Sequence, residues 1–259
     1  FCRWSFFWWA VDAFDYALAE KETDVIVNRQ IIVALDVSNK ADLNALVSQL
    51  PTDLCRVKIG KELYTALGPE SVEICHRAGH EVFLDLKFHD IPNTCAMAVR
   101  AAARLGVWMT NVHCSGGHAM LEAACSILAE ESHRPLLIGV TVLTSFDAET
   151  LRSIGVSRAL NEQVLALARM AQNAGLDGVV CSAHEASSLK TLCGQSFALV
   201  TPGIRPHWAS ADDQSRIVTP SQALDAGSDY LVIGRPVTQA KDPADALARI
   251  VAEIAQPIG

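Results

Sequence analysis

From residue 30 onward, short runs of apolar residues alternate with longer segments in which apolar residues recur every three or four positions. Eight apolar runs occur, at 31–36, 55–59, 81–87, 109–114, 136–142, 178–182, 198–203 and 230–234. Such nearly continuous apolar runs are typical of parallel strands that are buried on both faces. Segments with helical spacing lie between and after them, at 40–50, 69–77, 94–105, 117–130, 161–173, 183–192, 220–226 and 243–254.

Eight strands that alternate with eight helices predict βα units and a parallel sheet. Eight strands also close a barrel, and a chain of 259 residues has the usual length for one. The alternative is an open doubly wound sheet, which usually carries a glycine-rich phosphate turn after its first strand. Here the first strand ends in ALDVSN, without that turn. We therefore predict an α/β fold, a single (β/α)8 TIM barrel over residues 29–259, preceded by an N-terminal extension, 1–28, whose structure the pattern does not define.

Composition narrows the class of protein further. The net charge is −8 and no run of Lys and Arg is present, which argues against a nucleic-acid partner. Eight cysteines occur without any C-x-x-C pair, which is typical of free buried thiols in a reducing compartment. The first ten residues, FCRWSFFWWA, are rich in aromatics but too short to span a membrane, and they make a poor signal peptide. We expect a cytoplasmic protein without a membrane partner.

The densest group of charged residues is DLKFHD at 85–90. Asp85 and Lys87 are two residues apart, so on a regular strand both side chains point to the same side. Charges inside an apolar strand are costly unless they are paired, and Lys58 on the neighbouring strand could join them. With Asp36 and Asp90 they form a network of five charges at the carboxyl ends of strands, where barrel enzymes carry their chemistry. The alternative is a buried ion-pair network that only fixes strand register.

The loops after the last two strands have the composition of a phosphate site. They read TPGIRP (201–206) and IGRPV (233–237), and loops at these positions commonly bind phosphate in this fold. Gly203 and Gly234 allow backbone N–H groups to approach an anion closely, and Arg235 can add a bidentate contact. The alternative is two ordinary tight turns. His113 could be a metal ligand or a base, but a hydrogen-bonded histidine at a strand end is the simpler interpretation, because no carboxylate pair completes a site.

The segment DLKFHDIPNT (85–94) resembles the orotidine 5'-phosphate decarboxylase family of the bacterial type. The resemblance extends from about residue 31 to 255 and leaves only the first ~30 residues without a counterpart. The motifs that carry it include VALD (33–36), KIGKELYTALGP (58–69), LGVWMTNVHCSGG (105–117), VTVLTS (140–145), GLDGVVCSA (175–183), LVTPGIRP (199–206) and DYLVIGRPVTQA (229–240). Motifs of this length in this order are highly specific.

The resemblance implies a cofactor-free, metal-free carboxy-lyase that makes UMP in pyrimidine biosynthesis. Lys87 is then the proton donor to C6 of the pyrimidine, and Asp85 lies beside the departing carboxylate. Lys58 and Asp90 complete the charge network. The resemblance also implies a homodimer, in which Asp90 and Thr94 reach into the partner's site.

The resemblance assigns the substrate contacts as well. Thr144 lies in the loop that covers the base, and Asp36 and Lys58 hold the ribose hydroxyls. The phosphate is held by Arg205, Gln214, Gly234 and Arg235.

Two other functions remain open. Metal-dependent sugar-phosphate decarboxylases and aldolases of the same superfamily share D-x-K-x-x-D, but their pattern has an acidic magnesium ligand on the second strand, where this chain has Lys58. A non-catalytic binder of nucleotide or sugar phosphate would need the phosphate loops but not the charge network.

Overall fold

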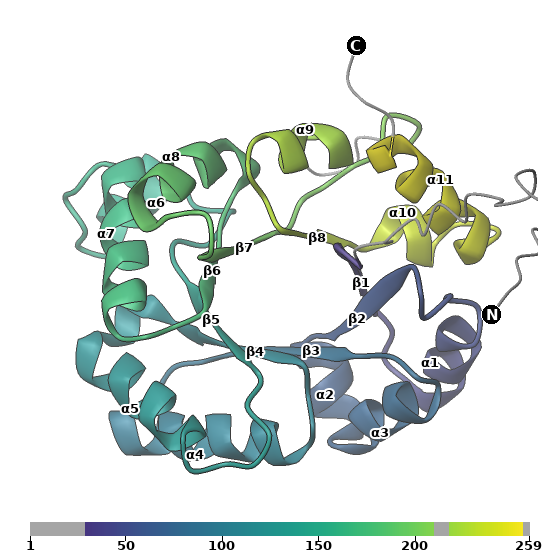
Figure 1. The fold of residues 1–259 in the computed structure, drawn as a ribbon, viewed down its shortest axis with the longest axis horizontal. Helices are drawn as coiled ribbons and strands as arrows, with labels where there is room; N and C mark the ends of the chain where they lie inside the picture. Colours follow the sequence, from purple (N-terminus) through teal and green to yellow (C-terminus); the bar gives the residue numbers. More distant parts are fainter. Residues whose placement is uncertain (1–28, 210–217, 256–259) are drawn as a thin grey trace, which may run out of the picture.

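Eight parallel strands close into a barrel in the order in which they occur along the chain (Figure 1). The computed structural model describes residues 29–209 and 218–255. Every strand pairs in parallel with the next, and β1 pairs with β8 to close the barrel. The predicted (β/α)8 barrel is therefore confirmed. The strands are β1 (Ile31–Ala34), β2 (Cys55–Ile59), β3 (Val82–Phe88), β4 (Met109–His113), β5 (Leu136–Val140), β6 (Gly178–Val180), β7 (Ala198–Thr201) and β8 (Tyr230–Ile233).

Helices surround the barrel on its outside (Figure 1). They are α1 (Lys40–Val47), α2 (Lys61–Leu67), α3 (Glu70–Arg77), α4 (Pro92–Arg104), the 3₁₀ turn η1 (Cys114–Gly116), α5 (His118–Leu128), α6 (Ala148–Ser153), α7 (Leu160–Asn173), α8 (Ala183–Cys193), α9 (Pro220–Asp225), α10 (Arg235–Thr238) and α11 (Pro243–Ala255). Sequence periodicity did not predict α2, α6 and α10. They have only 7, 6 and 4 residues, which is too short to display a repeated apolar face.

The apolar runs are continuous because each strand faces two cores. Ile32 packs inside the barrel with Phe83 and Met109, each at most 1% exposed. Its neighbours Ile31 and Val33 point the other way, into the core between the strands and the helices. Alternate residues of one strand therefore need apolar side chains for different reasons, which removes the alternation that a half-exposed strand would show.

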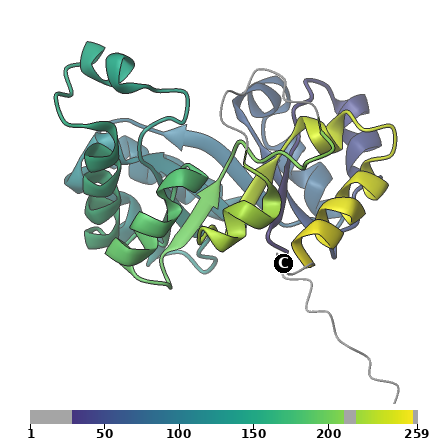
Figure 2. The ribbon, with the colours of Figure 1, turned by 90° about the horizontal axis from the view of Figure 1, so that it is seen from above.

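The two ends of the barrel differ in chemistry. Near the amino ends of the strands, the guanidinium of Arg56 lies 4.1 Å from the ring centre of Trp108 and 5.7 Å from that of Tyr230, and Arg56 Nε donates to Glu81 at 2.8 Å. The charged group of Arg56 is thus paired with a carboxylate and with two aromatic rings at that end. The connection from β5 to α7, with the short α6, stands out above the rest of the fold in Figure 2. Barrel enzymes carry their functional groups at the carboxyl ends of the strands, which is the opposite end from Arg56.

Some expectations fall on residues that the structure does not describe. The N-terminal extension and Gln214 lie outside the described residues. Among the helices that are described, none combines the length and the apolar character that crossing a bilayer requires.

Candidate active site

Asp85 and Lys87 lie at the carboxyl end of β3, where this strand leaves its regular pairing with β4. Three residues of β3, 85–87, face the single residue Asn111 of β4. Lys87 has a φ of 53°, in the left-handed region that residues other than glycine rarely adopt. Lys87 Nζ nevertheless lies 2.6 Å from Asp85 Oδ1. The structure thus brings the two side chains together through a bulge, rather than through the regular alternation on which the prediction rested.

The Asp85 carboxylate lies between two ammonium groups. Lys58 Nζ, from β2, is 3.3 Å from Asp85 Oδ2, and both side chains are 12% exposed. Burial by itself raises the pKa of Asp85, but the charges of Lys58 and Lys87, with hydrogen bonds from Lys87 and Asn111, outweigh burial and lower the pKa below its ordinary value. Asp85 is therefore ionised at neutral pH, and the two lysines share one strong counter-charge.

A cavity of about 250 Å³ adjoins this cluster. Four residues predicted for the site line it together: Asp36, Lys58, Asp85 and Lys87. Lys61, from the first turn of α2, lines the same cavity and was not among the predicted residues. The cavity thus offers a bound molecule both carboxylate and ammonium groups, from the segment after β1 and from β2 and β3.

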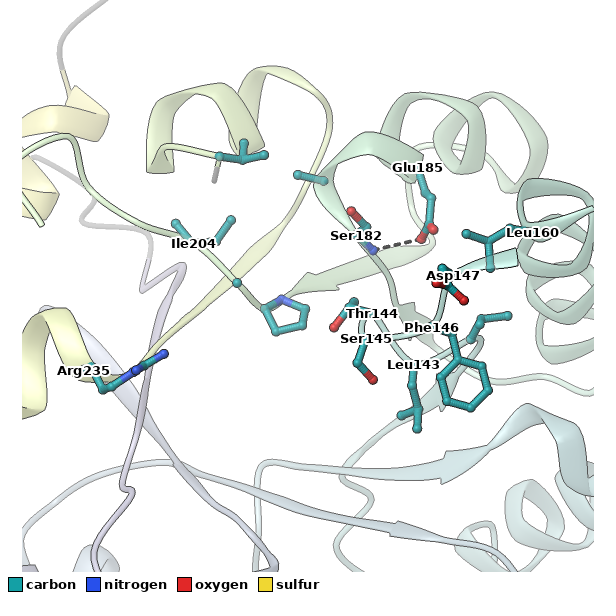
Figure 3. Close-up of a pocket in the computed structure, with 15 residues that line it drawn as sticks. Leu143, Thr144, Ser145, Phe146, Asp147, Leu160, Ser182, Glu185, Ile204 and Arg235 are labelled. Atoms are coloured by element: carbon teal, nitrogen blue, oxygen red, sulfur yellow. Dashed lines mark hydrogen bonds between the residues drawn. The ribbon is translucent and has the colours of Figure 1, made fainter. Parts of the chain in front are cut away.

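A second cavity, of about 680 Å³, is formed by the loops that follow β5, β6, β7 and β8. Figure 3 shows Thr144 and Ser145 on the loop after β5, and Arg235 approaching from the opposite side, at the start of α10. The Ser182 backbone N–H donates to Glu185 Oε2 at 2.9 Å, which fixes the start of α8 at the cavity wall. This cavity is large enough for a phosphorylated small molecule.

Two glycines shape the border between the cavities. Gly203 lines the larger cavity with a φ of 79°, a conformation that suits glycine alone without strain. A Cβ at Gly234 would lie 3.1 Å from Asp36 Oδ2, so any larger residue there would press on the Asp36 side chain. Asp36 lines the smaller cavity and Arg235 the larger one, so the close approach of Gly234 to Asp36 places the two cavities side by side.

Three other predicted residues lie apart from both cavities of the described chain. Asp90 and Thr94 are exposed, in the β3–α4 loop and the first turn of α4, and Asp90 Oδ1 accepts from the Ile91 N–H at 2.7 Å. Arg205 is 4% exposed, and its backbone N–H donates to the Val218 carbonyl at 3.0 Å. The roles of these three residues, like those of the other predicted site residues, stay predictions.

Sequence reasoning missed Asn111, which is fully buried behind the charge cluster. Its side-chain oxygen accepts from the Lys87 backbone N–H at 2.8 Å, and its amide nitrogen donates to Asp85 Oδ1 at 2.7 Å. The signal in the sequence was a polar residue inside the apolar run MTNVHC. A buried amide needs hydrogen-bond partners, so its place beside the DLK strand could have pointed to it.

His113, at the end of β4, stacks obliquely on His89 with ring centres 5.4 Å apart. Burial lowers the pKa of His113 to about 4, and the charges of His89, Lys61 and Lys87 act in the same direction. The imidazole is therefore neutral at physiological pH. Across residues 29–209 and 218–255, no three His, Cys, Asp or Glu side chains come together in a way that could hold a metal ion.

Barrels of this kind bind and convert small molecules at the carboxyl ends of their strands, and this chain is an enzyme of that class. It belongs to the Orotidine 5'-phosphate decarboxylase / HUMPS family, whose profile matches residues 29–250.

The matches to similar proteins span almost the whole length of those proteins. An orotidine 5'-phosphate decarboxylase of Pseudomonas fluorescens (strain SBW25) is 62% identical over 226 residues, which is 87% of this chain and 97% of the relative. One of Vibrio atlanticus is 58% identical over 224 residues, 86% of this chain and 97% of the relative. The crystal structure of orotidine 5'-phosphate decarboxylase from Lactobacillus acidophilus matches with a TM-score of 0.79 at 40% identity, covering 88% of this chain and all of the other.

Proposed function

We propose that this enzyme is an orotidine 5'-phosphate decarboxylase, a carboxy-lyase that releases CO2 and forms UMP in the cytoplasm, in de novo pyrimidine biosynthesis. The observation that carries the proposal is the Asp85 carboxylate held between the ammonium groups of Lys58 and Lys87 at a cavity mouth. A site for simple binding has no use for such a cluster. The names and high identity of the relatives support the same reaction.

Lys87 is the proton donor in this proposal. The bond from C6 to the carboxylate breaks, its electron pair stays on C6, and CO2 leaves. The Lys87 ammonium stabilises that carbanion as it forms and then gives its proton to C6, becoming a neutral amine that takes a proton back from water. Asp85 lies beside the departing carboxylate and holds the Lys87 ammonium at 2.6 Å. In this proposal, charged groups of the protein alone stabilise the carbanion.

The remaining contacts bind the ribose, the base and the phosphate of the nucleotide. Asp36 and Lys58 hold the ribose hydroxyls, and Thr144 belongs to the loop that closes over the base. Binding energy from the phosphate closes the loops and aligns the base, so losing it harms the rate as well as the affinity. The phosphate is held by Arg205, Gln214, Gly234 and Arg235.

Turnover of orotidine 5'-phosphate by the wild-type chain tests the function directly. We expect a fast absorbance change when the substrate is added to protein dialysed against EDTA, with the same rate after Mg²⁺ is added back. A rate that depends on Mg²⁺, with turnover of 3-keto sugar phosphates, would instead identify a sugar-phosphate decarboxylase. Binding of UMP without any turnover would identify a non-catalytic binder.

The proposal includes a homodimer whose active sites are shared, because Asp90 and Thr94 are exposed and lie away from both cavities of their own chain. The neighbouring residues Ile91 and Met97 are 67% and 39% exposed, and both are apolar. A surface that combines them with the polar pair suits a second copy of this chain, whose cavity Asp90 would enter.

Mixing two inactive variants, Lys87→Ala and Asp90→Ala, is expected to restore activity. In a mixed dimer, one of the two sites has both its own Lys87 and an intact Asp90 from the partner. Random association makes half of the dimers mixed, so about a quarter of all sites should regain wild-type activity. The measurement is kcat per chain after the mixture has been unfolded and refolded together. Mixed dimers that are verified by mass and show no recovery would contradict a shared site.

A further inference from the structure

The bulge at the end of β3 leaves backbone groups without partners in the sheet. Residues 85–87 face only Asn111 on β4, so the two backbones cannot continue their ladder there. Two β4 side chains take over. Thr110 Oγ1 donates to the Leu84 carbonyl at 3.1 Å, and the Asn111 side-chain oxygen accepts from the Lys87 N–H at 2.8 Å. Side chains thus replace the missing backbone bonds on both sides of the bulge.

Asn111 does more than satisfy the backbone, because its other end reaches the charge cluster. Asn111 Nδ2 donates to Asp85 Oδ1 at 2.7 Å, and the same oxygen accepts from Lys87 Nζ at 2.6 Å. One fully buried side chain therefore holds the backbone of Lys87 and the carboxylate to which Lys87 is paired. A carboxylic acid or a hydroxyl at this position could not donate and accept with the same fixed geometry at neutral pH.

The left-handed φ of Lys87, 53°, needs such an anchor. A lysine in this region of backbone space costs free energy and persists only where its surroundings hold it. The hydrogen bond that the Lys87 N–H donates to the Asn111 side-chain oxygen holds this peptide in place. Without it, the backbone of 85–87 is free to relax toward a regular extended strand, which would turn the ammonium away from its present position.

We propose that Asn111 is a positioning residue for the decarboxylation: it holds Lys87 and Asp85 in the relative geometry that proton transfer to C6 requires. The inference rests on the proposed function and deepens it, because it names a fully buried residue that lines neither cavity. A displacement of about 1 Å in a reacting group can cost about a hundredfold in rate. The effect should fall on kcat, since the ribose and phosphate contacts lie on other elements.

Two variants of Asn111 test the proposal, with Thr110→Val as the matched control. We expect Asn111→Ala to lower kcat about a hundredfold while the Kd for UMP stays within about threefold of wild type. Amide hydrogen exchange over residues 84–88 should quicken, because the Lys87 N–H has lost its acceptor. Thr110→Val removes the other bulge hydrogen bond but touches neither charged side chain, so its kcat should stay within about threefold of wild type.

Asn111→Asp separates positioning from simple packing, because it keeps the size of the side chain. Its new carboxyl faces Asp85, and one of two adjacent carboxyls has a raised pKa. When protonated, the new carboxyl can still donate to Asp85; when ionised, it repels Asp85. The kcat of the variant relative to wild type should therefore fall by about tenfold or more as pH rises from about 5 to about 8.

Three results would overturn the inference. The first is a folded Asn111→Ala that keeps kcat within threefold of wild type. The second is an equal loss in Thr110→Val, which would mean that any disturbance of the bulge has the same effect. The third is a flat pH dependence of the Asn111→Asp ratio. A wild-type chain that does not turn over orotidine 5'-phosphate would instead overturn the proposed function, and the exchange rates at 84–88 would still report whether Asn111 holds the bulge.

Discussion

Replacing Lys87 with alanine is expected to lower kcat by about 10⁴-fold or more, because one side chain supplies two effects. It gives the proton that C6 takes up, and its positive charge stabilises the carbanion before the proton moves. The variant should still bind UMP within about threefold of wild type, since that nucleotide keeps its ribose and phosphate contacts. The measurement is the absorbance change on adding orotidine 5'-phosphate to wild type and variant side by side.

Lys40→Ala is the matched control for this variant. Lys40 is an exposed lysine that pairs with Glu70 on the outside of the barrel, so kcat should not change. If Lys87→Ala is folded, binds UMP and keeps kcat within tenfold of wild type, the proton comes from another group. Lys61, which lines the same cavity, would then be the next residue to test.

The barrel could be predicted because the burial of a strand determines which residue types a short segment can contain. A strand that faces a core on each side, as at Ile31–Val33, has to be apolar throughout, and eight such runs separated by helical spacing leave few folds to choose from. The charge cluster could be predicted for the same reason. Lys58, Asp85 and Lys87 are costly inside apolar strands unless they meet, and both ammonium groups lie within 3.3 Å of the Asp85 carboxylate.

The bulge and its anchor could not be predicted, because strand periodicity assumes one residue opposite another. The sequence of residues 85–87 does not indicate that Lys87 has a positive φ, because this angle depends on how β3 and β4 pair. Asn111 belongs to a different strand, 24 residues along the chain from Lys87, so only the folded register brings them together. The short helix α10 was missed for a related reason: its four residues are set by the turn at Gly234 rather than by an apolar face.

Replacing Asp85 with asparagine is the second large effect we expect, and it should appear in both activity and stability. The amide keeps the shape of the side chain but removes the charge shared by Lys58 and Lys87. We expect kcat to fall by about 10³-fold. Unfolding should become easier by about 3 kcal/mol, the low end for breaking a buried pair, because Lys87 keeps 26% of its side chain exposed to water. The measurements are kcat and the free energy of unfolding in urea.

Asp229→Asn provides the matched control, because it breaks a comparable pair away from the cavities. Asp229 Oδ2 accepts from Lys190 Nζ and from the Leu199 N–H, both at 2.7 Å, just before β8 begins. This variant should lose stability while kcat stays at the wild-type value. A fall of kcat in Asp229→Asn as large as in Asp85→Asn would show that weakened folding, rather than the lost charge at the site, explains both losses.

The stability difference between wild type and Asp85→Asn should itself depend on pH, and its sign follows from the lowered pKa. Burial raises the pKa of Asp85, but the charges of the two lysines outweigh burial, so the folded state holds this pKa below its ordinary value. The carboxylate therefore contributes its full stability above the unfolded pKa of about 3.9, and the contribution is lost as pH falls through the folded pKa. Urea unfolding curves of the two proteins should lie apart at neutral pH and converge in acid below about pH 4. A gap that stays constant into acid would mean that the shape of the Asp85 side chain, rather than its charge, holds the cluster together.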